Sequence, residues 1–342
     1  MPATAPTPPP PRPSKRLDLA LAVAAVAWFL AARELAAHSA SGISQRFDLL
    51  AIGFVLRPLF LVFLLAVGFS LLDLVGHRHS SVRDLLGLPA RLTSLQEWNL
   101  GAAIGWSALL LSIVPIAMFG TLHIQLWTEP RAFLYALFTL IGVALSTLAL
   151  EIAFRGYAFR RLIAAIGPIG ATLTLSLVYG LLFAFSPGSS GVAVLAMALV
   201  GLLLSLGWLR THGLWLSWGL NFAWTTSLGV LFGLPVAGST DLSSIFQTTA
   251  FGKRSLTGGE FGPEAAVFTT LVLLLAIAPL VRLTRDYAWN YTYTPILPGG
   301  FAMEVAPPAA HAAMAAAVPP PPPLVQILPS TPQQRSAGEP PV

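Results

Sequence analysis

The chain has 342 residues, of which 55% are hydrophobic and only 10% are charged. A soluble domain carries about a quarter charged residues, so this composition excludes a water-soluble protein and indicates lipid as the solvent for much of the surface. Cysteine is absent, which excludes disulfides and cysteine nucleophiles, and the net charge of +5 is spread between apolar segments rather than gathered in one stripe, so no nucleic-acid partner is expected.

The chain begins with a proline-rich segment, residues 1–16, which cannot form a hydrophobic core and is expected to be a disordered tail. Apolar stretches of roughly membrane-crossing length follow at 18–37, 49–74, 99–119, 132–150, 168–186, 191–209, 213–233 and 265–283. Only helices satisfy the backbone in lipid, so the predicted fold is all-α, a polytopic transmembrane bundle of about eight helices. Residues 295–342 are rich in proline and alanine and are predicted to form a second disordered tail.

Basic residues predict the orientation of the bundle. With eight alternating helices, the side that carries both termini receives Arg12, Lys15, Arg16, Arg78, Arg83, Arg91, Arg155, Arg160, Arg161, Arg210, Arg282 and Arg285. The other side receives Arg33, Arg46, Arg131, Lys253 and Arg254. Because basic residues are enriched on the cytoplasmic side, both termini are predicted to be cytoplasmic, in a bacterial-type cytoplasmic membrane.

Two places carry charge at membrane depth, where each charged residue is a candidate functional residue. Arg57 lies near the start of the second stretch, and the simpler interpretation is an arginine that reaches the interface. Glu151 ends the fourth stretch and Arg155 follows four residues later, which places both on one face of a continuing helix. The pair is either structural or marks a carboxylate at the edge of an intramembrane cavity, and both interpretations stay open. The following segment, 154–162, is predicted to be an amphipathic helix on the cytoplasmic surface.

A series of ordered motifs extends from this point in both directions. They are EWNLGAAIGW at 97–106, LEIAFRGY at 150–157, AIGPIGATL at 165–173, YGLLFAFSPG at 179–188, GLWLSWGLNFAW at 213–224, GLPVAGS at 233–239 and LTGGEFGPEA at 256–265. Through these motifs the chain resembles the CPBP family, the CAAX proteases and bacteriocin-processing enzymes, also called the Abi family. The first two apolar stretches are expected to form two N-terminal transmembrane helices at 17–82, and the resemblance implies a CAAX-protease-like membrane domain at 83–294.

The resemblance further implies a glutamate-dependent intramembrane endopeptidase. In the family, the first glutamate of an adjacent pair and a histidine activate water, while a second histidine and a polar partner stabilise the oxyanion. Carried over to this sequence, the second glutamate is Glu151 and the motif arginine is Arg155, so both are retained. The first glutamate of the pair falls on Leu150.

The other chemical positions are also substituted. The histidine that would activate water falls on Phe183, the oxyanion histidine falls on Asn221, and its polar partner falls on Thr225. Leucine and phenylalanine can neither accept nor donate a proton, whereas asparagine and threonine can still donate hydrogen bonds. All four positions that would perform the chemistry are therefore changed.

Three hypotheses follow. The leading one is a catalytically degenerate family member that binds a membrane-associated peptide or protein without cleaving it. The alternative is an active endopeptidase whose site has shifted to Glu151, Arg155, Asn221 and Thr225, so whether the chain is an enzyme stays open. A transporter is less favoured, because there are few intramembrane charges and no evident repeat. Neither a cofactor nor a metal is expected, since the histidines lie in loops, at the ends of the stretches or in the tail.

Overall fold

The computed structural model describes residues 14–47, 50–76, 80–242 and 245–287. The chain divides into one unit at 1–294 and a second at 295–342, and every described residue belongs to the first. The two predicted tails therefore lie outside the described residues, apart from Ser14 to Arg16 at the start of the first helix.

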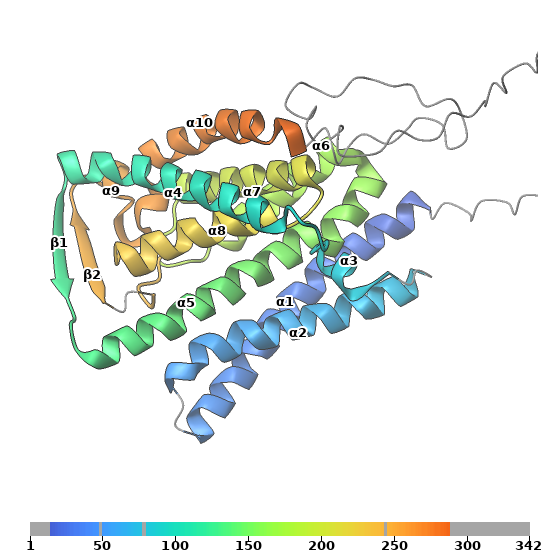
Figure 1. The fold of residues 1–342 in the computed structure, drawn as a ribbon, viewed down its shortest axis with the longest axis horizontal. Coiled ribbons are helices and arrows are strands. Elements are labelled where there is room, and N and C mark those ends of the chain that lie inside the picture. Colours follow the sequence, from blue (N-terminus) through green and yellow to red (C-terminus); the bar gives the residue numbers. More distant parts are fainter. Residues whose placement is uncertain (1–13, 48–49, 77–79, 243–244, 288–342) are drawn as a thin grey trace, which may run out of the picture. The chain divides into compact units, whose positions relative to one another are not determined.

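Within the described ranges the chain forms ten α-helices and a two-stranded sheet (Figure 1). The α-helices are α1 Lys15–Arg46, α2 Leu50–Val75, α3 Val82–Leu86, α4 Ser94–Phe119, α5 Pro130–Glu151, α6 Tyr157–Leu182, α7 Gly191–Thr211, α8 Trp215–Thr226, α9 Arg254–Thr257 and α10 Val267–Leu283. Short π-helical segments are η1 Ile152–Gly156 and η2 Ser227–Leu231, and 3-10 turns are η3 Gly259–Phe261 and η4 Pro263–Ala265. The eight longer α-helices overlap the eight predicted stretches, which confirms the all-α polytopic fold.

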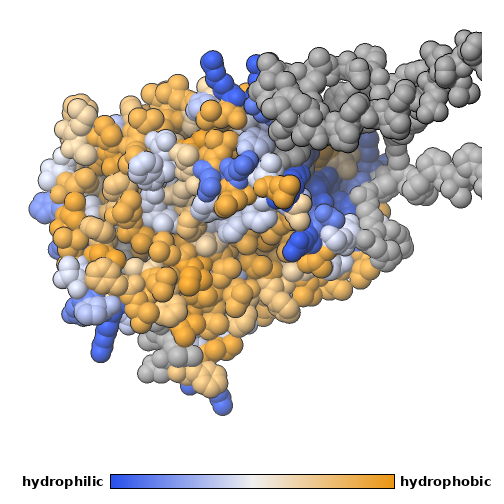
Figure 2. All heavy atoms as spheres, viewed as in Figure 1, coloured by the Kyte–Doolittle hydropathy of each residue, from blue (hydrophilic) through white to orange (hydrophobic). Residues whose placement is uncertain are grey.

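The long helices lie side by side, with α1 against α2 and α6, α6 against α7, α5 against α2 and α8, and α10 against α4 and α7 (Figure 1). In the described part of the chain, five helical stretches are long and apolar enough to cross a membrane, with α5, η1 and α6 counted as one. Large apolar side chains such as Phe63, Leu111 and Leu177 are exposed on these helices. Figure 2 shows a broad apolar face with the hydrophilic side chains gathered mainly toward its edges. A face of this kind fits lipid better than water.

Helices α4 and α8 make a close backbone contact through glycine. Gly101 and Gly105 form a G-x-x-x-G pattern on α4, and a methyl group on Gly105 would overlap the carbonyl oxygen of Leu220 on α8. Gly219 makes the reciprocal approach to the backbone of α4 at Trp98. Small residues let helix backbones approach closely inside a membrane, where packing rather than water drives association. This contact fixes α8, which carries Asn221 and Thr225.

The two-stranded sheet was not predicted from the sequence. Strand β1, Thr121–Leu126, pairs antiparallel with β2, Phe246–Phe251, so that Thr121 lies opposite Phe251. The sheet lies beyond the end of α4 (Figure 1). Its two strands are separated by more than a hundred residues, so no hairpin turn marks their pairing in the sequence.

The prediction of an amphipathic surface helix at 154–162 is wrong. Phe154, Tyr157 and Phe159 are at most 2% exposed, and Arg161 is 5% exposed. Helices α1, α2 and α7 pack against this segment, so its apolar side chains are buried together with Arg155 and Arg161, while Arg160 is half-buried. The segment is the centre of the bundle rather than its surface.

Candidate functional site

Glu151 is the last residue of α5 and is fully buried. Its Oε1 accepts a hydrogen bond from Nδ2 of Asn221 on α8 at 2.8 Å, and the Nη1 of Arg155 lies 3.5 Å from the same oxygen. The pair expected from the four-residue spacing is therefore present, and α8 adds a third member to it. Thr225 extends the cluster, since its hydroxyl donates to Oδ1 of Asn221 at 3.4 Å.

Arg155 is also buried, and its guanidinium connects this cluster to α7. Its Nη2 donates to the carbonyl oxygen of Gly201 at 2.9 Å, and its Nε donates to Oγ of Ser205 at 3.4 Å. The guanidinium carbon lies 4.7 Å from the centre of the Tyr179 ring, a distance typical of a cation–π contact. Glu151 and Arg155 thus cross-link α5, α7 and α8 within the bundle.

The chain between these two residues is not a regular α-helix. Residues Ile152–Gly156 form the π-helical segment η1, and Gly156 itself has φ −79° and ψ −116°, outside the helical region. Single π-helical turns inside α-helices occur frequently at functional sites. Here the irregular turn brings Arg155 to face α7 while Glu151 faces α8.

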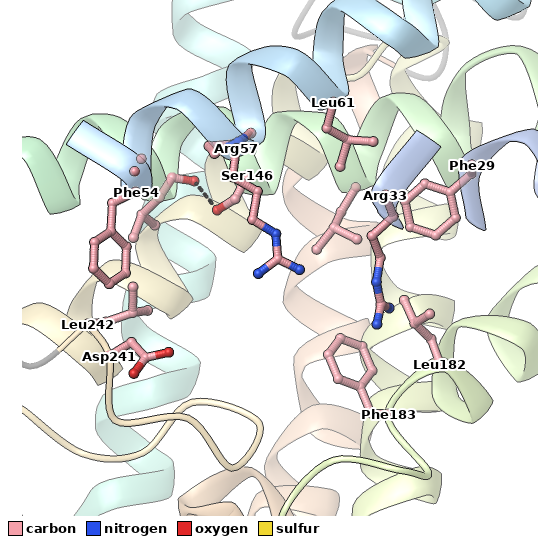
Figure 3. Close-up of a pocket in the computed structure, with 15 residues that line it drawn as sticks. Phe29, Arg33, Phe54, Arg57, Leu61, Ser146, Leu182, Phe183, Asp241 and Leu242 are labelled. Atoms are coloured by element: carbon pink, nitrogen blue, oxygen red, sulfur yellow. Dashed lines mark hydrogen bonds between the residues drawn. The ribbon is translucent and has the colours of Figure 1, made fainter. Parts of the chain in front are cut away.

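Leu150 and Phe183 lie elsewhere, in the wall of a cavity of about 490 Å³. The residues that line this cavity are Phe29, Arg33, Gly53, Phe54, Arg57, Pro58, Leu61, Gly142, Val143, Ser146, Leu150, Leu182, Phe183, Asp241 and Leu242 (Figure 3). Glu151, Asn221 and Thr225 are not among them. The ring of Phe183 packs edge-on against Tyr179, with 5.4 Å between the ring centres. The structure therefore divides the six positions into two groups. Glu151, Arg155 and Asn221 form a buried polar cluster that the half-buried Thr225 extends, and Leu150 and Phe183 line the cavity.

The sequence patterns did not identify three charged residues that line the cavity or form buried ion pairs. Arg33 contributed only to the predicted orientation of the bundle, although it lies well inside α1 and lines the cavity. Asp18 and Asp73 were not considered, yet both are buried and both pair with Arg161, at 3.3 Å and 2.6 Å. The signal for them was available, because Asp73 is the one acidic residue of α2 and Asp18 is followed by an apolar stretch without another acidic residue until Glu34. No three histidine, aspartate or glutamate side chains of the described ranges converge into a possible metal site.

The fold and the cluster together define a polytopic helical membrane protein with a buried glutamate–arginine–asparagine centre beside a lateral cavity. Residues 133–227 match the family model described as type II CAAX prenyl endopeptidase Rce1-like. This segment contains Glu151, Arg155, Phe183, Asn221 and Thr225. The match confirms the predicted relationship to the CAAX proteases for the segment that carries the site, and it supports an integral membrane protein. Neither the search of curated proteins nor that of solved structures found a match.

Proposed function

We propose that this protein is a catalytically inactive relative of the CAAX prenyl endopeptidases, which binds a membrane-associated peptide or protein without cleaving it. The observation that carries the proposal is the identity of the two side chains in the cavity wall. Leu150 and Phe183 occupy the positions of the activating glutamate and histidine, and both side chains line the cavity. Neither side chain can take a proton from water, so the cavity has no general base at these positions.

Glu151 does not fill the missing role. It is one residue along from Leu150, it is 0% exposed, and its Oε1 is occupied by Asn221 and Arg155. A general base must lie within hydrogen-bond reach of the proton that it removes, directly or through one water molecule. Together with the bonds of Arg155, those of Glu151 instead join α5, α7 and α8, which supports the structural interpretation of the pair.

One observation favours the alternative, an active endopeptidase with a shifted site. The second carboxylate oxygen of Glu151, Oε2, is buried and accepts no hydrogen bond from the described residues. A carboxylate oxygen left open in this way could hold a water molecule. Asn221 and Thr225 would then supply the donors for an oxyanion.

The experiment compares two full-length proteins reconstituted in liposomes with a library of membrane-anchored peptides, including prenylated C-terminal peptides. One protein is the wild type, and the other carries Leu150→Glu, Phe183→His, Asn221→His and Thr225→Asn. The expected result is no cleavage by the wild type and measurable cleavage by the restored protein. The matched control carries only the last three changes and should stay silent, because it lacks the general base. Thermal unfolding of each protein checks that it is folded.

The competing outcome is equally specific. If the wild type cleaves a peptide and Glu151→Gln abolishes that cleavage in a folded protein, the active site has moved and the chain is an enzyme. Loss of a general base typically lowers the rate by about 10²–10⁴-fold, so the two outcomes are well separated.

The positive-inside distribution of lysine and arginine also supports a proposed orientation with both termini in the cytoplasm, in a bacterial-type cytoplasmic membrane. The sheet formed by β1 and β2 would then lie on the external side, at the end of α4 from which β1 continues. No soluble cofactor enters this proposal.

A further inference from the structure

The cavity beside Leu150 and Phe183 has the composition of a ligand site in its own right. Its volume of about 490 Å³ falls within the roughly 300–1,000 Å³ that ligand-binding pockets occupy. Most of its wall is apolar, with side chains such as Phe29 and Leu61. Phe54, from α2, lines the cavity and is 41% exposed, so the cavity opens to the surroundings of the bundle.

Arg57 supplies a positive charge to this apolar space. It lies seven residues into α2, about 10 Å along the helix from Leu50. Figure 3 shows its guanidinium directed into the cavity. No described residue forms an ion pair or a hydrogen bond with that guanidinium. A charge at membrane depth is costly, so a guanidinium directed into a cavity without a partner among the described residues indicates a partner that comes from outside the protein.

Arg33 reaches the same cavity from α1 (Figure 3). It lies 13 residues before the last residue of α1, Arg46, about 20 Å along the helix. Its Nε lies 3.5 Å from the carboxylate of Glu34, and its terminal nitrogens are directed toward Phe183. Asp241 is the acidic residue of the lining, so two arginines and one aspartate give the wall a net charge of +1.

We infer that this cavity binds an anionic phospholipid of the surrounding bilayer. The phosphate would lie between the guanidiniums of Arg33 and Arg57, and an acyl chain would cover the apolar wall. Guanidinium groups bind phosphate through paired, charge-assisted hydrogen bonds, which are about twice as strong as neutral ones. A lipid provides a phosphate for the two arginines and an acyl chain for the apolar side chains of the wall. It also enters from the bilayer without crossing water. The inference goes beyond the proposed function. It does not depend on whether the chain cleaves peptides, but it places a lipid in this cavity, so a peptide partner would bind the protein elsewhere.

The test uses the purified full-length protein in detergent, with bound lipid counted by native mass spectrometry. The probes are dioleoyl phosphatidylglycerol, which is anionic, and dioleoyl phosphatidylcholine, which is zwitterionic with the same chains. We expect preferential retention of phosphatidylglycerol and a loss of about tenfold in its affinity for Arg57→Gln and for Arg33→Gln, as for removal of one charged hydrogen-bond donor. Arg57→Lys should restore part of the loss.

Two matched variants make the result specific. Arg131→Gln removes an exposed arginine at the start of α5 that does not line the cavity, and it should leave retention unchanged. Asp241→Asn removes the one negative charge of the lining, so it should increase retention of phosphatidylglycerol. Thermal unfolding without added lipid checks that every variant is folded.

Three results would overturn the inference. The first is equal retention of phosphatidylglycerol by the wild type and a folded Arg57→Gln variant. The second is displacement of the lipid by inorganic phosphate at matched concentration, which would show that a soluble anion is the ligand. The third is displacement, dependent on Arg57, by an apolar peptide with a free C-terminal carboxylate, which would show that the cavity is a peptide site.

Discussion

Replacing Arg161 by alanine is expected to lower the free energy of unfolding by about 3–5 kcal/mol, because it removes a cation that pairs with two buried carboxylates. The Nη1 of Arg161 lies 3.3 Å from Oδ1 of Asp18 on α1, and its Nη2 lies 2.6 Å from Oδ1 of Asp73 on α2. The guanidinium carbon also lies 4.7 Å from the centre of the Tyr157 ring. The three charged residues are between 2% and 5% exposed. Arg161 therefore joins the N-terminal helix pair to α6.

The magnitude follows from the balance between attraction and desolvation. With an effective dielectric constant near 20, unit charges at these distances attract by about 5 and about 6 kcal/mol. Withdrawing each ion from water costs several kcal/mol, so the intact triad contributes little net free energy. Removing the cation cancels the attraction but leaves the cost of burying Asp18 and Asp73, and this asymmetry makes the single substitution severe.

The assay is denaturant-induced unfolding of the purified protein in detergent at neutral pH. Arg160→Ala is the control, since this neighbouring arginine is half-buried and its Nη2 donates to the backbone carbonyl oxygen of Leu85, at 3.2 Å, rather than to a carboxylate. Its loss should cost about 1 kcal/mol. Adding Asp18→Asn and Asp73→Asn to Arg161→Ala should recover part of the stability. The reasoning fails if Arg161→Ala costs no more than Arg160→Ala, or if the two asparagine changes recover nothing.

Two further predictions concern packing and pH. Gly105→Ala should cost about 1–3 kcal/mol in the same unfolding assay, because its methyl group would overlap the carbonyl oxygen of Leu220. Gly42→Ala is the matched control, since a Cβ there has no neighbour within 4 Å, and equal losses for the two variants would contradict the packing argument. Glu264 lies in η4 before α10, and burial raises its pKa to about 7, against the hydrogen bonds from Trp224 and the backbone, which lower it. The folded protein then holds more protons than the unfolded chain between about pH 4.5 and 7, so stability is fully present below this window and falls by about 3 kcal/mol as pH rises through it. Glu264→Gln should flatten this dependence, and identical pH profiles for variant and wild type would refute the assignment.

The positions of the membrane helices could be predicted because one physical quantity, the length of an apolar run, determines them. The error at 154–162 has a physical cause. An amphipathic pattern shows that two environments exist around a helix, but it does not identify them. Around Arg161 the polar environment is supplied by Asp18 and Asp73 rather than by water. The β1–β2 pairing depends on contacts between distant segments, which a local pattern cannot show.

The site was predictable in part for the same reason. The four-residue spacing of Glu151 and Arg155 predicted their contact, and the contact forms although the chain between them is π-helical rather than α-helical. The family motif placed Asn221 near a catalytic centre, but it did not show that this side chain would bind Glu151 itself. The cavity could not be predicted, because Arg33 and Phe183 come from segments that are separated by 150 residues and meet only in the folded chain.

The π-helical turn at Ile152–Gly156 interrupts the regular α-helix, so the rotation of α6 about its axis relative to α5 depends on the length of this turn. The faces of α5 are fixed by α2 and α8, and those of α6 by α1 and α7. Each residue added to or removed from a helix rotates everything beyond it by about 100°. A change of one residue in the length of this turn would thus leave both helices intact. Arg161 could then no longer face Asp18 and Asp73 while Glu151 faces Asn221. The number of residues in this segment therefore constrains the architecture, in addition to the contacts that Arg155 makes.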